Sequence, residues 1–84
     1  AAKWAAFGWT VLKMDGHNMS EILKTMEDAR AACGQGKPVV ILMTTIMGKG
    51  VSFMEGNHKW HGSPPSNEQK DKALSELTET LGDY

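Results

Sequence analysis

The sequence lacks the usual means by which a short chain stabilises itself. It has one cysteine, Cys33, among 84 residues, so it cannot form an internal disulfide. No set of cysteines and histidines has zinc-finger spacing. At this length a hydrophobic core alone rarely leaves more than about 3–5 kcal/mol of net stability. We therefore expect the chain to depend on other polypeptide, and the lone thiol favours a cytoplasmic location.

Net charge and hydropathy argue against two classes of partner, nucleic acids and membranes. Nine lysines and arginines oppose ten acidic residues, and this net charge of −1 argues against nucleic acid as a primary partner. No apolar run approaches the roughly 20 residues of a membrane span, and no signal peptide is visible, so we expect no membrane partner. Residues 1–7 have helical composition without an initiator methionine or an N-cap. Either a leader was removed or the chain was cut from a longer one, and we favour the second.

The first half of the sequence predicts a βαβ unit behind a short helix that stops at Gly8. Residues 9–14 have the aromatic and β-branched composition of a strand. Asn18 is a good N-cap for the following helix, and Glu21 occupies N3, where a capping box carries its acid. Apolar residues recur at the spacing i, i+4, i+7, i+11, which predicts a buried helix face made of Ile22, Met26, Ala29 and Cys33.

Residues 39–43 form an unbroken apolar run, which is typical of a parallel strand covered on both faces. The fold class is therefore α/β, with two parallel strands and flanking helices in one partial domain over residues 1–84. Two strands leave two open sheet edges. We expect the sheet to be completed by self-association or by the remainder of a larger protein, with Trp4, Phe7 and Trp9 in a core or an interface.

A long loop over residues 44–65 follows the second strand. Ser66 then caps a final helix with Gln69 at N3, and its apolar face would carry Ala73, Leu74, Leu77 and Leu81. Within the loop, Gly48 and Gly50 bracket a turn beyond the carboxyl end of a strand, where open α/β sheets bind ligands. No phosphate-loop or dinucleotide pattern is present. The glycines alone leave two readings, a plain tight turn or a backbone that approaches a ligand.

Two histidines, His58 and His61, lie in the same loop around Trp60. Three readings stay open: surface residues without a role, imidazoles that hydrogen-bond a phosphate or a substrate hydroxyl, or a zinc site that also uses His17. The surrounding glycines and prolines predict a loop rather than a helix, which disfavours the metal pair. A loop tryptophan between glycines often contacts a partner or a ligand.

Five short motifs occur in order along roughly residues 4–82: Phe7-Gly8-Trp9, Asp15-Gly16-His17-Asn18, Gly36-Lys37-Pro38, Gly48-Lys49-Gly50-Val51-Ser52-Phe53-Met54-Glu55 and Trp60-His61-Gly62-Ser63-Pro64-Pro65. Each motif is weak alone, but the series is specific. It resembles the thiamine-diphosphate-binding domain of transketolases, especially the split form whose amino-terminal half is a separate subunit. The resemblance implies a partial thiamine-diphosphate-binding fold.

The resemblance also implies a reaction and roles for particular residues. The family transfers a two-carbon ketol unit between sugar phosphates, a reaction of the pentose phosphate pathway, with thiamine diphosphate held through Mg²⁺. His61 would lie beside the cofactor diphosphate and the substrate as a catalytic residue, and His58 would contact the substrate. Met47 would pack on the aminopyrimidine ring, and Gly48 and Gly50 would let the loop approach the cofactor.

Part of the family's machinery is missing from this sequence. The Gly-Asp-Gly motif that binds the metal and the diphosphate does not occur, so we assign no metal ligand. The glutamate that activates the cofactor belongs to the other half-domain. We therefore expect a fragment that contributes one wall of the site and is inactive alone, completed by the rest of a transketolase. The alternative is a non-catalytic truncated module that self-associates through its open sheet.

Overall fold

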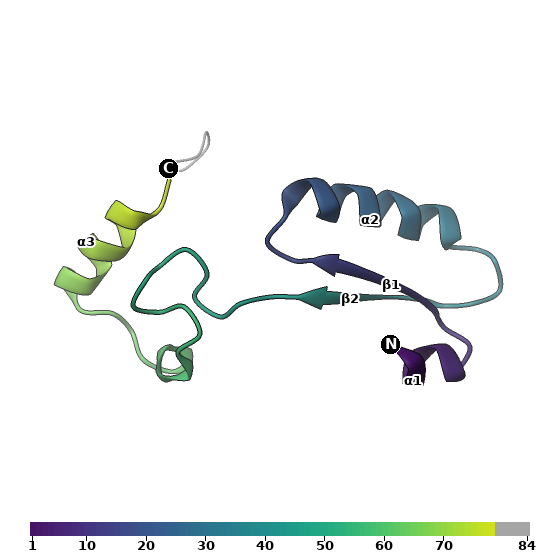
Figure 1. Cartoon of the computed structure of the whole chain (residues 1–84), viewed down its shortest axis with the longest axis horizontal. Helices are drawn as coiled ribbons and strands as arrows, with labels where there is room; N and C mark the ends of the chain where they lie inside the picture. Colours follow the sequence, from purple (N-terminus) through teal and green to yellow (C-terminus); the bar gives the residue numbers. More distant parts are fainter. Residues whose placement is uncertain (79–84) are drawn as a thin grey trace. The chain divides into compact units, whose positions relative to one another are not determined.

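The computed structural model describes residues 1–78, so the predicted face position Leu81 lies outside the described residues. Along the chain the elements are α1 (Ala2–Ala6), β1 (Thr10–Asp15), α2 (Met19–Ala32), β2 (Val39–Thr44), the 3₁₀ helix η1 (His58–His61) and α3 (Asn67–Glu76), as Figure 1 shows. Within residues 1–78, no helix is long and apolar enough to span a membrane. Contacts divide the chain into a first unit, residues 1–45, and a second unit that begins at Ile46.

The first unit is the predicted βαβ arrangement. Strands β1 and β2 pair in parallel from Thr10 against Val39 to Asp15 against Thr44. Helix α2 connects them and lies along the sheet (Figure 1). The α/β class and the two parallel strands are confirmed, with each strand extending to one residue beyond its predicted end.

The junction between β1 and α2 is held by three side chains. Asn18 caps α2, since its Oδ1 accepts a hydrogen bond from the Glu21 backbone N–H at 3.1 Å, as predicted. The Glu21 carboxylate does not close a capping box; it accepts from the Asp15 N–H at 3.0 Å. The reason is that the Asn18 N–H already donates to the Asp15 carbonyl. Asp15 Oδ1 in turn accepts from the His17 N–H at 2.9 Å, which fixes the turn.

The buried face of α2 differs from the prediction. Thr25 and Ala29 are buried and Ile22 is half-buried, whereas Met26 is 53% exposed. Cys33 is exposed because it ends the helix in an extended conformation. A two-stranded sheet is narrow, so it fully covers only Thr25 and Ala29 along the middle of the helix face. The larger side chains on the flank remain outside.

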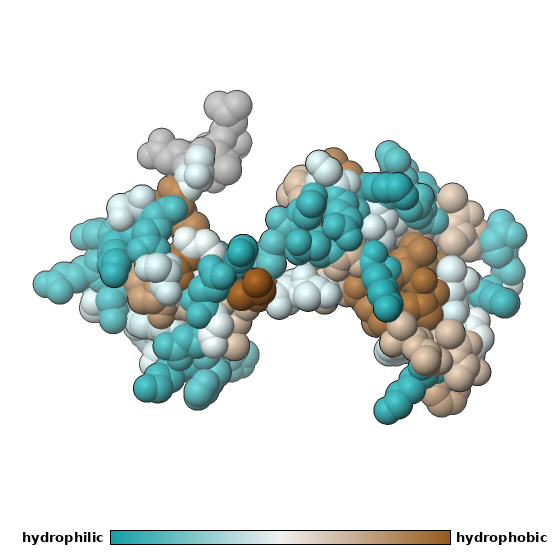
Figure 2. Space-filling model, viewed as in Figure 1, coloured by the Kyte–Doolittle hydropathy of each residue, from teal (hydrophilic) through white to brown (hydrophobic). Residues whose placement is uncertain are grey.

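The core of the first unit is thin. Met14 is buried while its neighbour Lys13 is exposed, which is the alternation of a sheet covered on one face. Residues 39–42 are only half-buried, so residues 1–78 alone do not cover both faces of β2. Figure 2 shows hydrophobic atoms gathered over the strands between α1 and α2. The described residues contain no large side chain that is fully buried.

The aromatic residues at the start of the chain separate into a pair and a single exposed ring. Trp4 and Trp9 meet edge to face with their ring centroids 5.0 Å apart. Phe7 is 84% exposed, although a core or interface position was predicted. No residue of the described chain provides Phe7 with a core, so an interface remains the prediction for this ring.

The second unit is built from tight turns, η1 and α3. Val51 is buried, and Phe53, Trp60 and Ala73 are half-buried. The predicted cap of α3 is confirmed as a full capping box. The expected face of α3 is only partly covered, since Leu74 and Leu77 are exposed with Ala73 half-buried.

Candidate functional site

The glycine turn adopts backbone angles that only glycine reaches easily. Gly48 and Gly50 have φ of +67° and +94°. A Cβ on Gly48 would lie 2.6 Å from the backbone carbonyl of Met54. The turn is closed by a bond from the Val51 N–H to the Gly48 carbonyl and by one from the Gly56 N–H to the Met47 carbonyl. Tight-turn geometry therefore explains Gly48 without a ligand.

A carboxylate closes the same turn from the other side. Glu55 accepts a hydrogen bond from the Gly50 N–H at 3.3 Å. Its second oxygen lies 3.6 Å from the Lys49 ammonium, and both side chains are exposed. An exposed pair of this kind contributes little to stability, so the backbone bonds determine the shape of the turn.

A second carboxylate joins the glycine turn to α3. Glu76 accepts from the Ser52 N–H at 2.6 Å and from the Ser52 hydroxyl at 2.7 Å, across 24 residues of sequence. These two bonds favour the charged form and hold the pKa of Glu76 below its usual value. Sequence reasoning missed this pair, because no local pattern links residues so far apart.

The histidines lie on a 3₁₀ helix rather than in the irregular loop that was predicted. Asn57 caps η1 by accepting from the Lys59 N–H at 3.1 Å, which explains why the segment coils. In a 3₁₀ helix the side chains at i and i+3 eclipse, so His58 and His61 leave the same side of η1. Both imidazoles are exposed. Among residues 1–78, no group of three histidines, cysteines or carboxylates could hold a metal ion.

Trp60 connects η1 to the glycine turn. Its indole Nε1–H donates to the Phe53 carbonyl at 3.0 Å, and the two rings meet edge to face at 5.3 Å. The Lys72 ammonium from α3 lies 5.5 Å from the centre of the Phe53 ring. Trp60 therefore has an internal partner in Phe53, and an external contact for its ring stays a prediction. Through this bond the structure brings the His61 turn and the glycine turn together.

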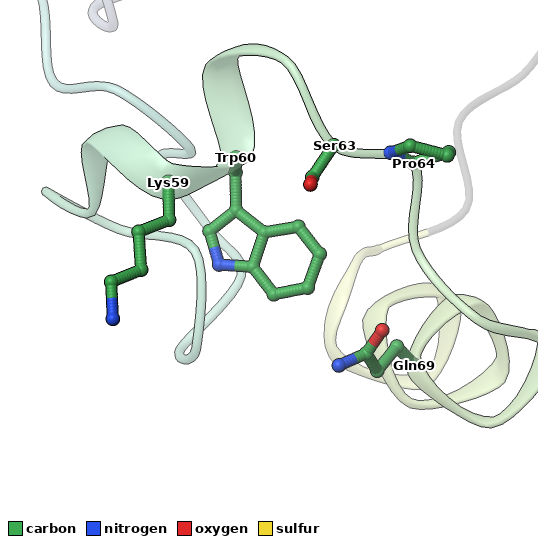
Figure 3. Close-up of a pocket in the computed structure, with 5 residues that line it drawn as sticks. All are labelled: Lys59, Trp60, Ser63, Pro64 and Gln69. Carbon is green, nitrogen blue, oxygen red and sulfur yellow. The ribbon is translucent and has the colours of Figure 1, made fainter.

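A pocket of about 220 Å³ opens beside η1, lined by Lys59, Trp60, Ser63, Pro64 and Gln69. In Figure 3 the hydroxyl of Ser63 and the carboxamide of Gln69 point toward the space beside the six-membered ring of Trp60. Lys59 lies on the other side of the indole in this view. Among these residues the sequence suggested a ligand or partner contact only for Trp60, since the pocket depends on how α3 folds back.

The remaining predicted site residues are distributed between the two units. Met47 is 46% exposed beside Gly48, so it presents apolar surface to solvent. His17 is exposed at the end of β1, in the first unit. The second unit thus combines the apolar side chain of Met47, a glycine turn closed by backbone hydrogen bonds and two exposed imidazoles. This set can contact an organic ring and donate hydrogen bonds to oxygen atoms.

Comparison with known proteins gives a consistent result. Residues 1–82 match the family described as "Transketolase, thiamine diphosphate binding domain". The chain is 48% identical over 75 residues to a 6-deoxy-6-sulfo-D-fructose transketolase subunit of Clostridium sp. (strain MSTE9), covering 89% of this chain and 26% of that protein. It is 40% identical over 79 residues to an apulose-4-phosphate transketolase subunit of Phocaeicola vulgatus, covering 94% and 27%.

A longer relative matches at lower identity. Human transketolase is 32% identical over 74 residues, which is 86% of this chain and 11% of that protein. The chain thus spans about a quarter of the length of the subunit-type relatives that it matches.

Proposed function

The chain belongs to the transketolase family through its thiamine diphosphate binding domain, and we propose that its second unit forms one wall of the cofactor and sugar phosphate site for two-carbon ketol transfer. The observation that supports this most directly is the bond from Trp60 Nε1 to the Phe53 carbonyl. It fixes the histidine-bearing turn against the glycine turn, so both can contact one ligand.

Each residue of this wall has a proposed task. The half-exposed side chain of Met47 packs on the aminopyrimidine ring of the cofactor. Gly48 and Gly50 keep the adjacent backbone free of side chains. His61 hydrogen-bonds the diphosphate and the reacting substrate, and His58, on the same side of η1, contacts the substrate. When bound, thiamine diphosphate supplies the carbanion and the electron sink, and the protein orients its partners.

Magnesium is proposed to be held by other polypeptide. The described residues offer no group of three possible ligands, and the sequence lacks the Gly-Asp-Gly motif. We therefore derive no role for Mg²⁺ from this chain. Two of the relatives are named as subunits, which supports a partner that completes the site. The isolated chain is proposed to be inactive.

A second candidate is a non-catalytic module that self-associates. The observation favouring it is the two-stranded sheet, whose outer edges have no strand beside them within residues 1–78, together with the exposed side chains of Met19, Leu23 and Phe7 in the same unit. Sedimentation at low micromolar concentration tests this candidate: a discrete oligomer supports it, and a folded monomer contradicts it.

A chimera tests the leading proposal. The residues of this chain replace the aligned segment of the Phocaeicola vulgatus subunit, and ketol transfer is measured in its complete transketolase. We expect an active chimera in which His61→Ala lowers kcat/KM by about 10²-fold or more. Lys70→Ala, an exposed lysine paired with Asp71, is the matched control and leaves the rate unchanged. A chimera whose rate is the same with and without the His61 imidazole contradicts the proposal.

A further inference from the structure

The free polar side-chain groups of the pocket beside Trp60 are nearly all donors. Two of its side-chain polar atoms are occupied: Trp60 Nε1 donates to Phe53, and Gln69 Oε1 accepts from the Ser66 N–H at 2.8 Å. Three others have no hydrogen-bond or ion-pair partner among residues 1–78, namely the Lys59 ammonium, the Ser63 hydroxyl and the Gln69 NH₂. All three are donors, although the hydroxyl can also accept.

The charge of the lining has one sign. Lys59 carries the single full charge among the lining residues, and no carboxylate lines the pocket. A pocket that offers donors and a positive charge complements a ligand rich in acceptor oxygens with negative charge. Its volume of about 220 Å³ is below the roughly 300–1,000 Å³ of pockets for drug-sized ligands, so the occupant is small.

We propose that this pocket binds a tetrahedral oxyanion, the phosphate or sulfonate of a small organic ligand. The Ser63 hydroxyl and the Gln69 NH₂ donate to its oxygens, and both point into the same space in Figure 3. Lys59 at the rim supplies the attracting charge, and the face of Trp60 supports the carbon atoms next to the anion. The site stands on these residues alone and does not depend on the function proposed for His61, which does not line the pocket.

Titration with inorganic phosphate tests the proposal on the 84-residue chain at constant ionic strength. The reporters are the NMR signals of the Trp60 indole N–H, the Gln69 side-chain NH₂ and the Ser63 amide. We expect saturable shifts with a Kd on the order of 1 mM, since a few exposed hydrogen bonds and one charge carry the binding. Shifts that stay linear up to about 50 mM, or that appear equally over the whole chain, overturn the proposal.

Three variants assign the effect to the pocket. Gln69→Glu keeps an acceptor for the Ser66 N–H, so α3 retains its capping box, but it places a negative charge where the donor was. We expect it to raise the Kd at least tenfold. Lys59→Gln raises it about threefold to fivefold, as one exposed charge does. Lys70→Gln removes the same charge outside the pocket and leaves the Kd unchanged. Equal effects of Lys59→Gln and Lys70→Gln contradict the proposal.

Two further titrations identify the source of the anion. A pentose phosphate that binds at least tenfold more tightly than inorganic phosphate, with larger Trp60 shifts, assigns the pocket to the substrate. Thiamine diphosphate showing the same preference assigns it to the cofactor. Equal affinities for all three assign it to the bare oxyanion. The ketol-transfer assay of the chimera is independent of these titrations, so either proposal can fail while the other holds.

Discussion

Replacing Gly48 by alanine should unfold the second unit. The loss of folding free energy has two parts, one conformational and one steric. The residue has φ of +67°, and a left-handed conformation costs a non-glycine residue roughly 1–2 kcal/mol. The added Cβ would also lie 2.6 Å from the Met54 carbonyl group. Backbone cannot move aside as a side-chain end can, so we assign this overlap the roughly 1–3 kcal/mol of an overpacked site.

The sum, about 2–5 kcal/mol, is comparable with the roughly 3–5 kcal/mol that a chain of this size retains. Gly56→Ala is the matched control, because its φ is +71° and nothing lies within 4 Å of the added Cβ. It should cost only the conformational part. Gly50→Ala should lie between the two, since its Cβ would meet the movable end of Leu77 at 3.2 Å.

Hydrogen exchange of the Val51 amide is the assay, because this N–H donates to the Gly48 carbonyl and the side chain is buried. Protection should be lost in Gly48→Ala and reduced only about tenfold in Gly56→Ala, which corresponds to roughly 1.4 kcal/mol. Equal protection of the Val51 amide in Gly48→Ala and Gly56→Ala would show that the Met54 backbone moves aside at no cost. The steric argument would then be wrong.

Three more predictions concern single hydrogen-bonding groups within the two units. The two bonds from Ser52 lower the pKa of Glu76, so the link is complete above the ordinary carboxyl pKa and is lost as the pH falls through the lowered value. The Ser52 amide shift should therefore titrate below the ordinary carboxyl pKa of 4.5 in the wild type and stay flat in Glu76→Gln. Asn18→Ala should destabilise α2 by about 1 kcal/mol, measured by amide exchange within the helix, whereas Asn18→Ser should restore the cap. Trp60→Phe keeps an aromatic ring but removes the indole N–H, so the second unit should lose about 1 kcal/mol of stability in urea unfolding; an unchanged midpoint would mean that the bond to Phe53 contributes nothing.

Local signals in the sequence predicted the elements of the fold well. The caps at Asn18 and Ser66 act within three residues of themselves, and the apolar run at residues 39–43 specifies a strand without distant partners. The buried face of α2 was predicted with Met26 inside because the periodic pattern assumes a covering surface as wide as the apolar stripe. The width of the sheet, which the pattern does not contain, decides which residues are buried.

The candidate site was predictable only in part. Family resemblance supplied the roles predicted for His61, His58 and the glycines, and these roles stay predictions. Nothing in the local sequence indicated that Asn57 would coil the segment into η1. The bonds between Ser52 and Glu76 and between Trp60 and Phe53 join residues through folding rather than through spacing. The donor-lined pocket has the same origin, since Gln69 reaches it from α3 while Ser63 precedes that helix.

The uncovered second strand has a consequence for handling the chain. Residues 39–44, Val-Val-Ile-Leu-Met-Thr, contain no charge and no proline, and their outer edge has no strand beside it among the described residues. Six-residue segments of this composition form the dry interfaces of amyloid when they stack in register. On long incubation without a strand to cover this edge, the chain should slowly form aggregates that bind amyloid dyes. The substitution Met43→Lys, at a side chain that is 54% exposed, would suppress that aggregation, which makes β2 the place to engineer solubility.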